Sequence, residues 1–259
     1  MYFYIYDSFL SEKKHERTLA AVETRLTDLG ISGKIGRLSP FTSAKGLIRD
    51  EARRGTQTVV VVGNDETVAK AVEGIGEVKV TFGMIPVGTP TTIAKALGIP
   101  EGVEACDVLS KRVTQKIDLG KVNGKFFLSS VRIPGDRVVI EGEGQYRIST
   151  LASNCEIIVS NLRSGDLMEE GEGSLRNSGD PMDGLLDTLI MNRNGGFLGL
   201  TKQNGGSSVI PLRKMNIKSE EPIEVVADGS KFTNDTFNIE VVPDCLRVIT
   251  GRERIFAQI

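Results

Sequence analysis

The chain has 259 residues, of which 39% are hydrophobic and 25% are charged, a composition typical of soluble globular proteins. Its 32 basic and 34 acidic residues give a net charge near −2, which argues against a nucleic-acid-binding surface. No apolar run is long enough to cross a membrane. Residues 1–6 already resemble a strand, so we expect no leader before the fold. Three widely spaced cysteines favour reduced thiols in the cytoplasm over a disulfide framework.

The first hundred residues alternate between strand and helix patterns. Strands are predicted at 1–6, 31–38, 59–62 and 78–87, and helices at 11–29, 43–54, 67–74 and 91–97. Ser43 is the predicted cap of the second helix, and Gly30, Gly55 and Gly98 follow helix ends. This alternation predicts an α/β nucleotide-binding domain at 1–112 with a mostly parallel sheet covered on both faces.

The pattern changes near residue 112, where strands follow one another without helices. The predicted strands are 116–122, 125–131, 137–141, 146–150, 155–160, 185–191, 213–218, 222–227, 237–242 and 245–250. They predict an antiparallel β-sandwich domain at 113–259. Residues 163–181 are polar and rich in glycine, and we expect them to form a mobile loop.

Two strand–turn–helix junctions lie close together, at Val59–Val68 and at Ile85–Ala94. Where a helix begins after a buried strand, backbone N–H groups and the positive end of the helix dipole can bind an anion. Two such turns after successive strands predict a site for the phosphates of a nucleotide.

These turns resemble those of the diacylglycerol kinase catalytic fold, a family that includes bacterial lipid kinases and sphingosine kinases and is related to NAD kinases. The family's Gly-Gly-Asp-Gly-Thr turn corresponds to Gly63-Asn64-Asp65-Glu66-Thr67, and its Pro-x-Gly-Thr-x-Asn-Asp-x-Ala turn to Pro86–Ala94. Similar motifs follow at 97–100, 118–127, 183–187 and 228–229, so the resemblance covers nearly the whole chain.

The resemblance implies an ATP-dependent kinase, using Mg²⁺, that phosphorylates the hydroxyl of a diacylglycerol-like lipid or other small alcohol. Asp65 is then the candidate for metal or acceptor contact, and Asp187 is the candidate general base. The candidate nucleotide-binding residues are Gly63, Asn64, Thr67, Gly88, Thr89, Ser39 and Asp228. Implied partners are a nucleotide and the acceptor, with transient membrane-surface contact and a homodimer both compatible with the sequence.

Structural roles are the alternative for each of these residues. Asp65 can cap the following helix, Ser39 can cap a loop, and the others can be ordinary turn residues. Asp183, four residues before Asp187, can be a solvated turn acid.

The sequence also departs from the family's pattern at several positions. Asn64 and Glu66 replace two glycines, and a carboxylate that points into the turn would repel phosphate. Pro90 removes one N–H donor, and Thr91 and Thr92 replace the family's Asn-Asp pair. These changes leave open a second interpretation, in which the chain is a degenerate, catalytically inactive relative that acts as a nucleotide-binding or regulatory protein. A third interpretation is an NAD-kinase-like enzyme. It is weaker, because this sequence has no counterpart of the Gly-Ser-Thr-Ala-Tyr motif that NAD kinases carry later in the chain.

Overall fold

The computed structural model describes residues 1–144, 146–150, 155–162, 179–192 and 208–256. Packing divides them into two compact units, each of which is described by itself. The first contains residues 1–118 and 243–256, and the second contains the described residues from 119 to 242. The predicted domains, 1–112 and 113–259, did not include this return of the chain end to the first unit. The predicted loop at 163–181 lies, up to residue 178, outside the described residues.

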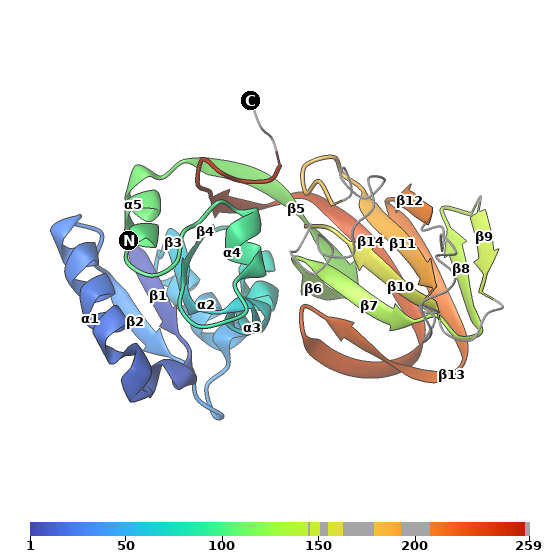
Figure 1. Ribbon diagram of the computed structural model, residues 1–259, viewed down its shortest axis with the longest axis horizontal. Coiled ribbons are helices and arrows are strands. Elements are labelled where there is room, and N and C mark those ends of the chain that lie inside the picture. The colour runs from blue at the N-terminus through green and yellow to red at the C-terminus, as the bar shows by residue number, and fades with distance from the viewer. Residues whose placement is uncertain (145, 151–154, 163–178, 193–207, 257–259) are drawn as a thin grey trace, which may run out of the picture. The chain divides into compact units, whose positions relative to one another are not determined.

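The first unit is built on a parallel sheet in the order β2–β1–β3–β4–β14 (Figure 1). Its strands are β1 (Tyr2–Tyr6), β2 (Lys34–Arg37), β3 (Thr58–Gly63), β4 (Thr81–Pro86) and the end of β14 (Ser230–Ile249). Its helices are η1 (Ser8–Ser11), α1 (Lys13–Asp28), α2 (Ala44–Arg53), α3 (Asp65–Gly76), α4 (Thr92–Ala96) and α5 (Glu104–Lys111). The predicted α/β arrangement with parallel strands is therefore confirmed, and α5 is an addition to it.

The core of this unit forms where the apolar strands meet the helices. All four valines from Val59 to Val62 are fully buried, as expected for a parallel strand with both faces covered. Val22 of α1 and Ile48 of α2 are also fully buried. Burial of each such side chain contributes about 1.5–3 kcal/mol, so this core holds the turns at the strand ends in place.

Two helix starts are set by polar side chains. Ser43 caps α2 as predicted, because its hydroxyl accepts a hydrogen bond from the Gly46 N–H at 3.4 Å. Helix α3 begins at Asp65, two residues before the predicted Thr67, because Asn64 is its cap.

Parallel strands end at the same edge of a sheet. The turns that follow β1, β2, β3 and β4 therefore lie along the carboxyl-terminal edge of the first unit. The strand order changes direction between β1 and β3, and such a switch point is where open α/β sheets bind ligands. The predicted nucleotide turns follow β3 and β4 at this edge.

The second unit consists of antiparallel strands, in agreement with the predicted pairing. They are β5 (Thr114–Val122), β6 (Lys125–Phe127), β7 (Ser130–Pro134), β8 (Val138–Gly142), β9 (Tyr146–Ser149), β10 (Cys155–Ser160), β11 (Leu186–Asn192), β12 (Ser208–Leu212), β13 (Lys214–Ala227) and most of β14. Strands β5 and β14 continue from one unit into the other. The packing of two sheets as a sandwich stays a prediction.

Several strand boundaries differ from the predictions, and β12 was not predicted. The predicted strand 125–131 is divided into β6 and β7. The predicted pairs 213–218 with 222–227, and 237–242 with 245–250, are the continuous strands β13 and β14, and β13 carries a register shift between Lys218 and Ile223.

Candidate functional site

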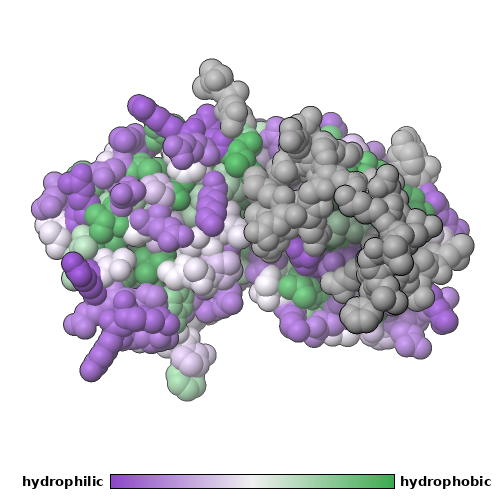
Figure 2. All heavy atoms as spheres, in the orientation of Figure 1, coloured by the Kyte–Doolittle hydropathy of each residue, from purple (hydrophilic) through white to green (hydrophobic). Residues whose placement is uncertain are grey.

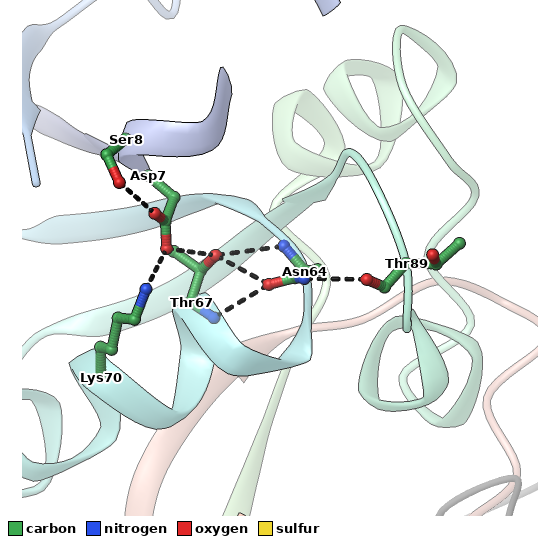
Figure 3. A network of polar contacts seen from close by, with 6 residues as sticks. All are labelled: Asp7, Ser8, Asn64, Thr67, Lys70 and Thr89. Carbon is green, nitrogen blue, oxygen red and sulfur yellow. Dashed lines mark hydrogen bonds and ion pairs between the residues drawn. The ribbon is translucent and has the colours of Figure 1, made fainter. Parts of the chain in front are cut away.

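The turn after β3 is held by a network of polar contacts at the switch point (Figure 3). The Asn64 side-chain oxygen accepts from the Thr67 N–H at 3.1 Å, and the Thr67 hydroxyl accepts from the Asn64 N–H at 3.2 Å. The two residues thus form a capping box. The Thr67 hydroxyl also lies 3.0 Å from Asp7 Oδ2, and the Asn64 amide nitrogen donates to the Thr89 carbonyl at 2.9 Å. Asn64 and Thr67 are therefore side chains that hold this turn together.

This network occupies backbone N–H groups that the sequence analysis had predicted to bind phosphate. The Thr67 N–H is bound by Asn64, and the Asp65 N–H donates to the Pro90 carbonyl at 2.9 Å. These two N–H groups at the start of α3 are therefore occupied by partners within the protein. The residue type at position 64 could have indicated this. Asn, unlike the family's glycine, has a side-chain oxygen that can accept hydrogen bonds from N–H groups at the start of a helix. A nucleotide contact of Asn64 or Thr67 stays a prediction.

Gly63 is required by close packing in the same turn. A Cβ atom placed on this residue would lie 2.3 Å from the Thr67 hydroxyl oxygen and 2.9 Å from its Cβ. Its φ of 155° is also one that residues with side chains rarely adopt. The glycine therefore lets Thr67 pack against the strand end, whether or not a ligand binds there.

Asp65 caps a helix, although a different one from the helix suggested by the sequence. Its carboxylate accepts from the Thr92 N–H at 2.7 Å, the Thr92 hydroxyl at 2.6 Å and the Ile93 N–H at 3.1 Å. These donors belong to the start of α4, not of α3. A carboxylate has about four lone-pair sites, and at least three are used here.

This arrangement bears on whether Asp65 could hold Mg²⁺. With its oxygens turned toward α4, Asp65 does not fit a metal ligand in this arrangement. Among the residues that the structure describes, no group of three or more acidic, histidine or cysteine side chains is placed to hold a metal.

The turn after β4 retains more free donors. Gly88 has a φ of 82°, the left-handed conformation that glycine adopts without strain, and Thr89 is exposed. Within the described residues, no protein acceptor contacts the N–H of Gly88 or Thr89. Thr91 is buried and donates to Glu101 at 2.9 Å, so it is used structurally. Of the two predicted turns, this one offers the better phosphate donors.

Two further residues of this edge are exposed. Ser39 lies in the turn after β2, where its hydroxyl is 2.8 Å from that of Thr42 and accepts from the Phe41 N–H at 3.3 Å. This is the loop-cap role, and a nucleotide contact stays a prediction. Glu66 is exposed, and its side chain makes no hydrogen bond or ion pair within the described part of the chain. Its carboxylate is thus not fixed inside the turn.

Asp7 and Lys70 were not among the predicted site residues. Asp7 is 4% exposed, and its carboxylate accepts from Lys70 Nζ at 2.8 Å and from the Ser8 hydroxyl at 3.1 Å (Figure 3). Burial alone would raise the pKa of Asp7, but the bonds from Lys70, Thr67 and Ser8 outweigh it and lower the pKa. A buried anion and its cation therefore occupy the switch point.

In the second unit, Asp187 lies near the start of β11, directly opposite Ser160 of β10. It is buried, and this burial raises the pKa of its carboxyl, against a hydrogen bond from the Gly179 N–H that lowers it. Asp183 is exposed, and its carboxylate accepts from the Leu185 N–H at 2.8 Å. A buried carboxylate with a raised pKa suits a general base, and the exposed Asp183 matches the predicted turn acid.

Asp228 also has a structural role. Its carboxylate accepts from the N–H groups of Leu128 at 2.6 Å, Ser129 at 2.8 Å and Ser130 at 3.1 Å, which explains the break between β6 and β7. Ser130 pairs with Ser160, which pairs with Asp187. The structure thus brings two predicted residues, Asp187 and Asp228, to the same end of one sheet. Asp65 belongs to the other unit, and its meeting with Asp187 stays a prediction.

Comparison with known proteins identifies relatives along most of the chain. Residues 2–122 match the model of the diacylglycerol kinase catalytic domain. A Pseudomonas aeruginosa protein named "Probable lipid kinase YegS-like" is 26% identical over 242 residues, 79% of this chain and 80% of that protein. A Bacillus subtilis diacylglycerol kinase is 31% identical over 121 residues, 45% of this chain and 39% of that one. A crystal structure of a diacylglycerol kinase from Bacillus anthracis str. Sterne has the same fold, with a TM-score of 0.75, 20% identity and 96% of both chains covered.

Proposed function

We propose that the chain is a kinase of the diacylglycerol kinase-like family, and that it transfers the γ-phosphoryl group of ATP to the hydroxyl of a lipid or other small alcohol; the similarity to diacylglycerol kinases and probable lipid kinases supports this. The observation that carries this proposal is Asp187, a buried carboxylate with a raised pKa at the start of β11. The raised pKa of its carboxyl is closer to neutral pH, and a general base is most effective when its pKa lies near the pH at which the enzyme works.

In the proposed reaction, Asp187 accepts the proton of the acceptor hydroxyl as the oxygen attacks the γ-phosphorus of ATP. The bond between that phosphorus and the bridging oxygen breaks, ADP leaves with the bonding electrons, and the acceptor becomes a phosphate ester. The N–H groups of Gly88 and Thr89 are the donors we assign to the phosphates. No step is assigned to a metal, since Asp65 as placed does not fit one.

The test is ATP consumption with diacylglycerol, sphingosine and small polyols as acceptors. Asp187→Asn keeps an oxygen to accept the Gly179 N–H but removes the base, so turnover should fall by about 10²–10⁴-fold. Asp183→Asn, four residues earlier in an exposed turn, is the matched control and should retain activity. Equal activity of wild type and Asp187→Asn would reject this assignment of the base.

A second candidate is a relative that binds a nucleotide, or regulates, without catalysis. It is favoured by the turns after β3 and β4, where Asn64 and Asp65 satisfy helix N–H groups that phosphate would otherwise contact. Thermal unfolding with ATP, ADP and NAD separates the candidates, because a ligand at 100 times its dissociation constant stabilises a protein by about 2.7 kcal/mol. Stabilisation without ATP consumption on any acceptor would favour the second candidate.

A further inference from the structure

The tip of the turn between β2 and α2 presents an aromatic ring to solvent. Phe41 is 99% exposed, whereas every other phenylalanine in the described residues is buried or half-buried. Pro40 beside it is also exposed, and Ile35 on the adjoining edge strand β2 is 47% exposed. In Figure 2 this loop projects from the lower edge of the first unit with apolar atoms at its end.

The exposure of Phe41 is maintained by the fold of the turn. Leu38 is buried and its N–H donates to the Tyr6 carbonyl at 2.8 Å, which fixes the start of the turn. The Thr42 N–H donates to the Ser39 carbonyl at 3.0 Å, and the Ser39 and Thr42 hydroxyls bond to each other. Because these polar groups form hydrogen bonds with one another, moving the tip from water into a less polar environment has a small desolvation cost.

The segments on either side of the tip are rich in basic residues, although most of them are ion-paired. Residues 34–54 hold six basic and two acidic side chains. Five of the six basic side chains form ion pairs, with Asp50 or Glu51 of α2 or with Glu73 or Glu77. Arg37, four residues before Phe41, is exposed, with its guanidinium 5.3 Å from the Tyr6 ring centroid. Lys45, four residues after Phe41, is ion-paired with Glu73 of α3 and with Glu77, which follows that helix, so it contributes less. Arg37 is therefore the basic residue of this segment for which no ion pair is formed within the described part of the chain.

We propose that this tip docks on the surface of a bilayer that contains anionic lipid, with Phe41 entering the headgroup region and Arg37 facing the lipid phosphates. An exposed aromatic ring beside a cation is the combination that membrane interfaces favour. No helix among the described residues is long and apolar enough to cross a membrane, so a contact of this kind would be peripheral. The inference rests on the proposed function in one respect, because a lipid acceptor lies in a bilayer.

The chain contains no tryptophan, so Phe41→Trp introduces a single reporter at the tip. Its fluorescence should shift to the blue with vesicles of phosphatidylcholine and phosphatidylglycerol, and much less with phosphatidylcholine alone. Phe41→Ala should weaken vesicle binding about tenfold, or about 1.4 kcal/mol. Arg37→Gln should weaken it about fivefold, close to the 1 kcal/mol that one cation contributes near such a surface.

Val113→Trp is the matched control, because Val113 is 47% exposed and lies after the end of α5, away from this turn in Figure 1. The fluorescence of this variant should not change with vesicles. Circular dichroism checks that each variant is folded. No shift at Phe41→Trp, or an equal shift with both vesicle types, would overturn the proposal. So would a shift caused by ATP without vesicles, or self-association that Phe41→Ala abolishes, because the tip would then contact a nucleotide or a second copy. Binding is measured without ATP or acceptor, so its failure is distinct from failure of the kinase proposal.

Discussion

Replacing Lys70 with methionine should destabilise the first unit by about 2 kcal/mol at neutral pH. The substitution leaves the Asp7 carboxylate, which is 4% exposed, without its cation at 2.8 Å. Removing one partner of a fully buried ion pair costs about 3–5 kcal/mol. The Lys70 side chain is 51% exposed, so water already screens part of this interaction and the expected cost is lower.

The loss should depend on pH with a defined sign. The folded-state pKa of Asp7 lies below its unfolded value, so Asp7 contributes stability above the unfolded pKa and loses it as pH falls through the folded pKa. In Lys70→Met the burial of Asp7 is no longer offset by the ammonium, so its pKa should rise. The difference between wild type and variant should therefore shrink as the solution becomes acidic.

Urea unfolding followed by helical circular dichroism measures this effect, because all the helices in the described residues belong to the first unit. Lys95→Met, in the last turn of α4, is an exposed control that should change stability by less than about 0.5 kcal/mol. In an Asp7→Asn background, Lys70→Met should cost little. An equal cost in both backgrounds would refute the reasoning, since the ion pair could not then be its source.

Three other substitutions test the site. Gly63→Ala should lower the free energy of unfolding in urea by about 2–3 kcal/mol, because the added Cβ would lie 2.3 Å from the Thr67 hydroxyl. The control Gly46→Ala, in α2, should be neutral or stabilising. Similar losses in both variants would contradict the packing role of Gly63. Asp187→Asn should raise stability at neutral pH, since the raised pKa of Asp187 means that its charge opposes folding there; a loss of stability would contradict that. Glu66→Gly should tighten ATP by about 1 kcal/mol in calorimetric titration, because a carboxylate next to the turn is removed; unchanged affinity would show that Glu66 is tolerated.

The sequence was sufficient for features that depend on neighbours in the chain. The four valines at 59–62 predicted a buried strand, Ser43 predicted a helix start, and residues 155–160 were placed as the strand that they form. Alternation of strand and helix predicted a parallel sheet, and with it the edge at which both turns lie. These features follow from side-chain periodicity and from caps within three or four residues.

Contacts between distant residues were decided only by the tertiary structure. Asp7 meets Lys70 across 63 positions, and Asp65 caps α4 across 27, so neither could be inferred from local spacing. Glycine in the family's turn leaves backbone N–H groups open, but whether Asn64 would fill that space depended on the position of Thr67. The pKa shifts also depend on the tertiary structure. The fold removes the carboxylates of Asp187 and Asp7 from water, and among the described residues a cation contacts only that of Asp7, so the pKa of Asp187 is raised and that of Asp7 is lowered.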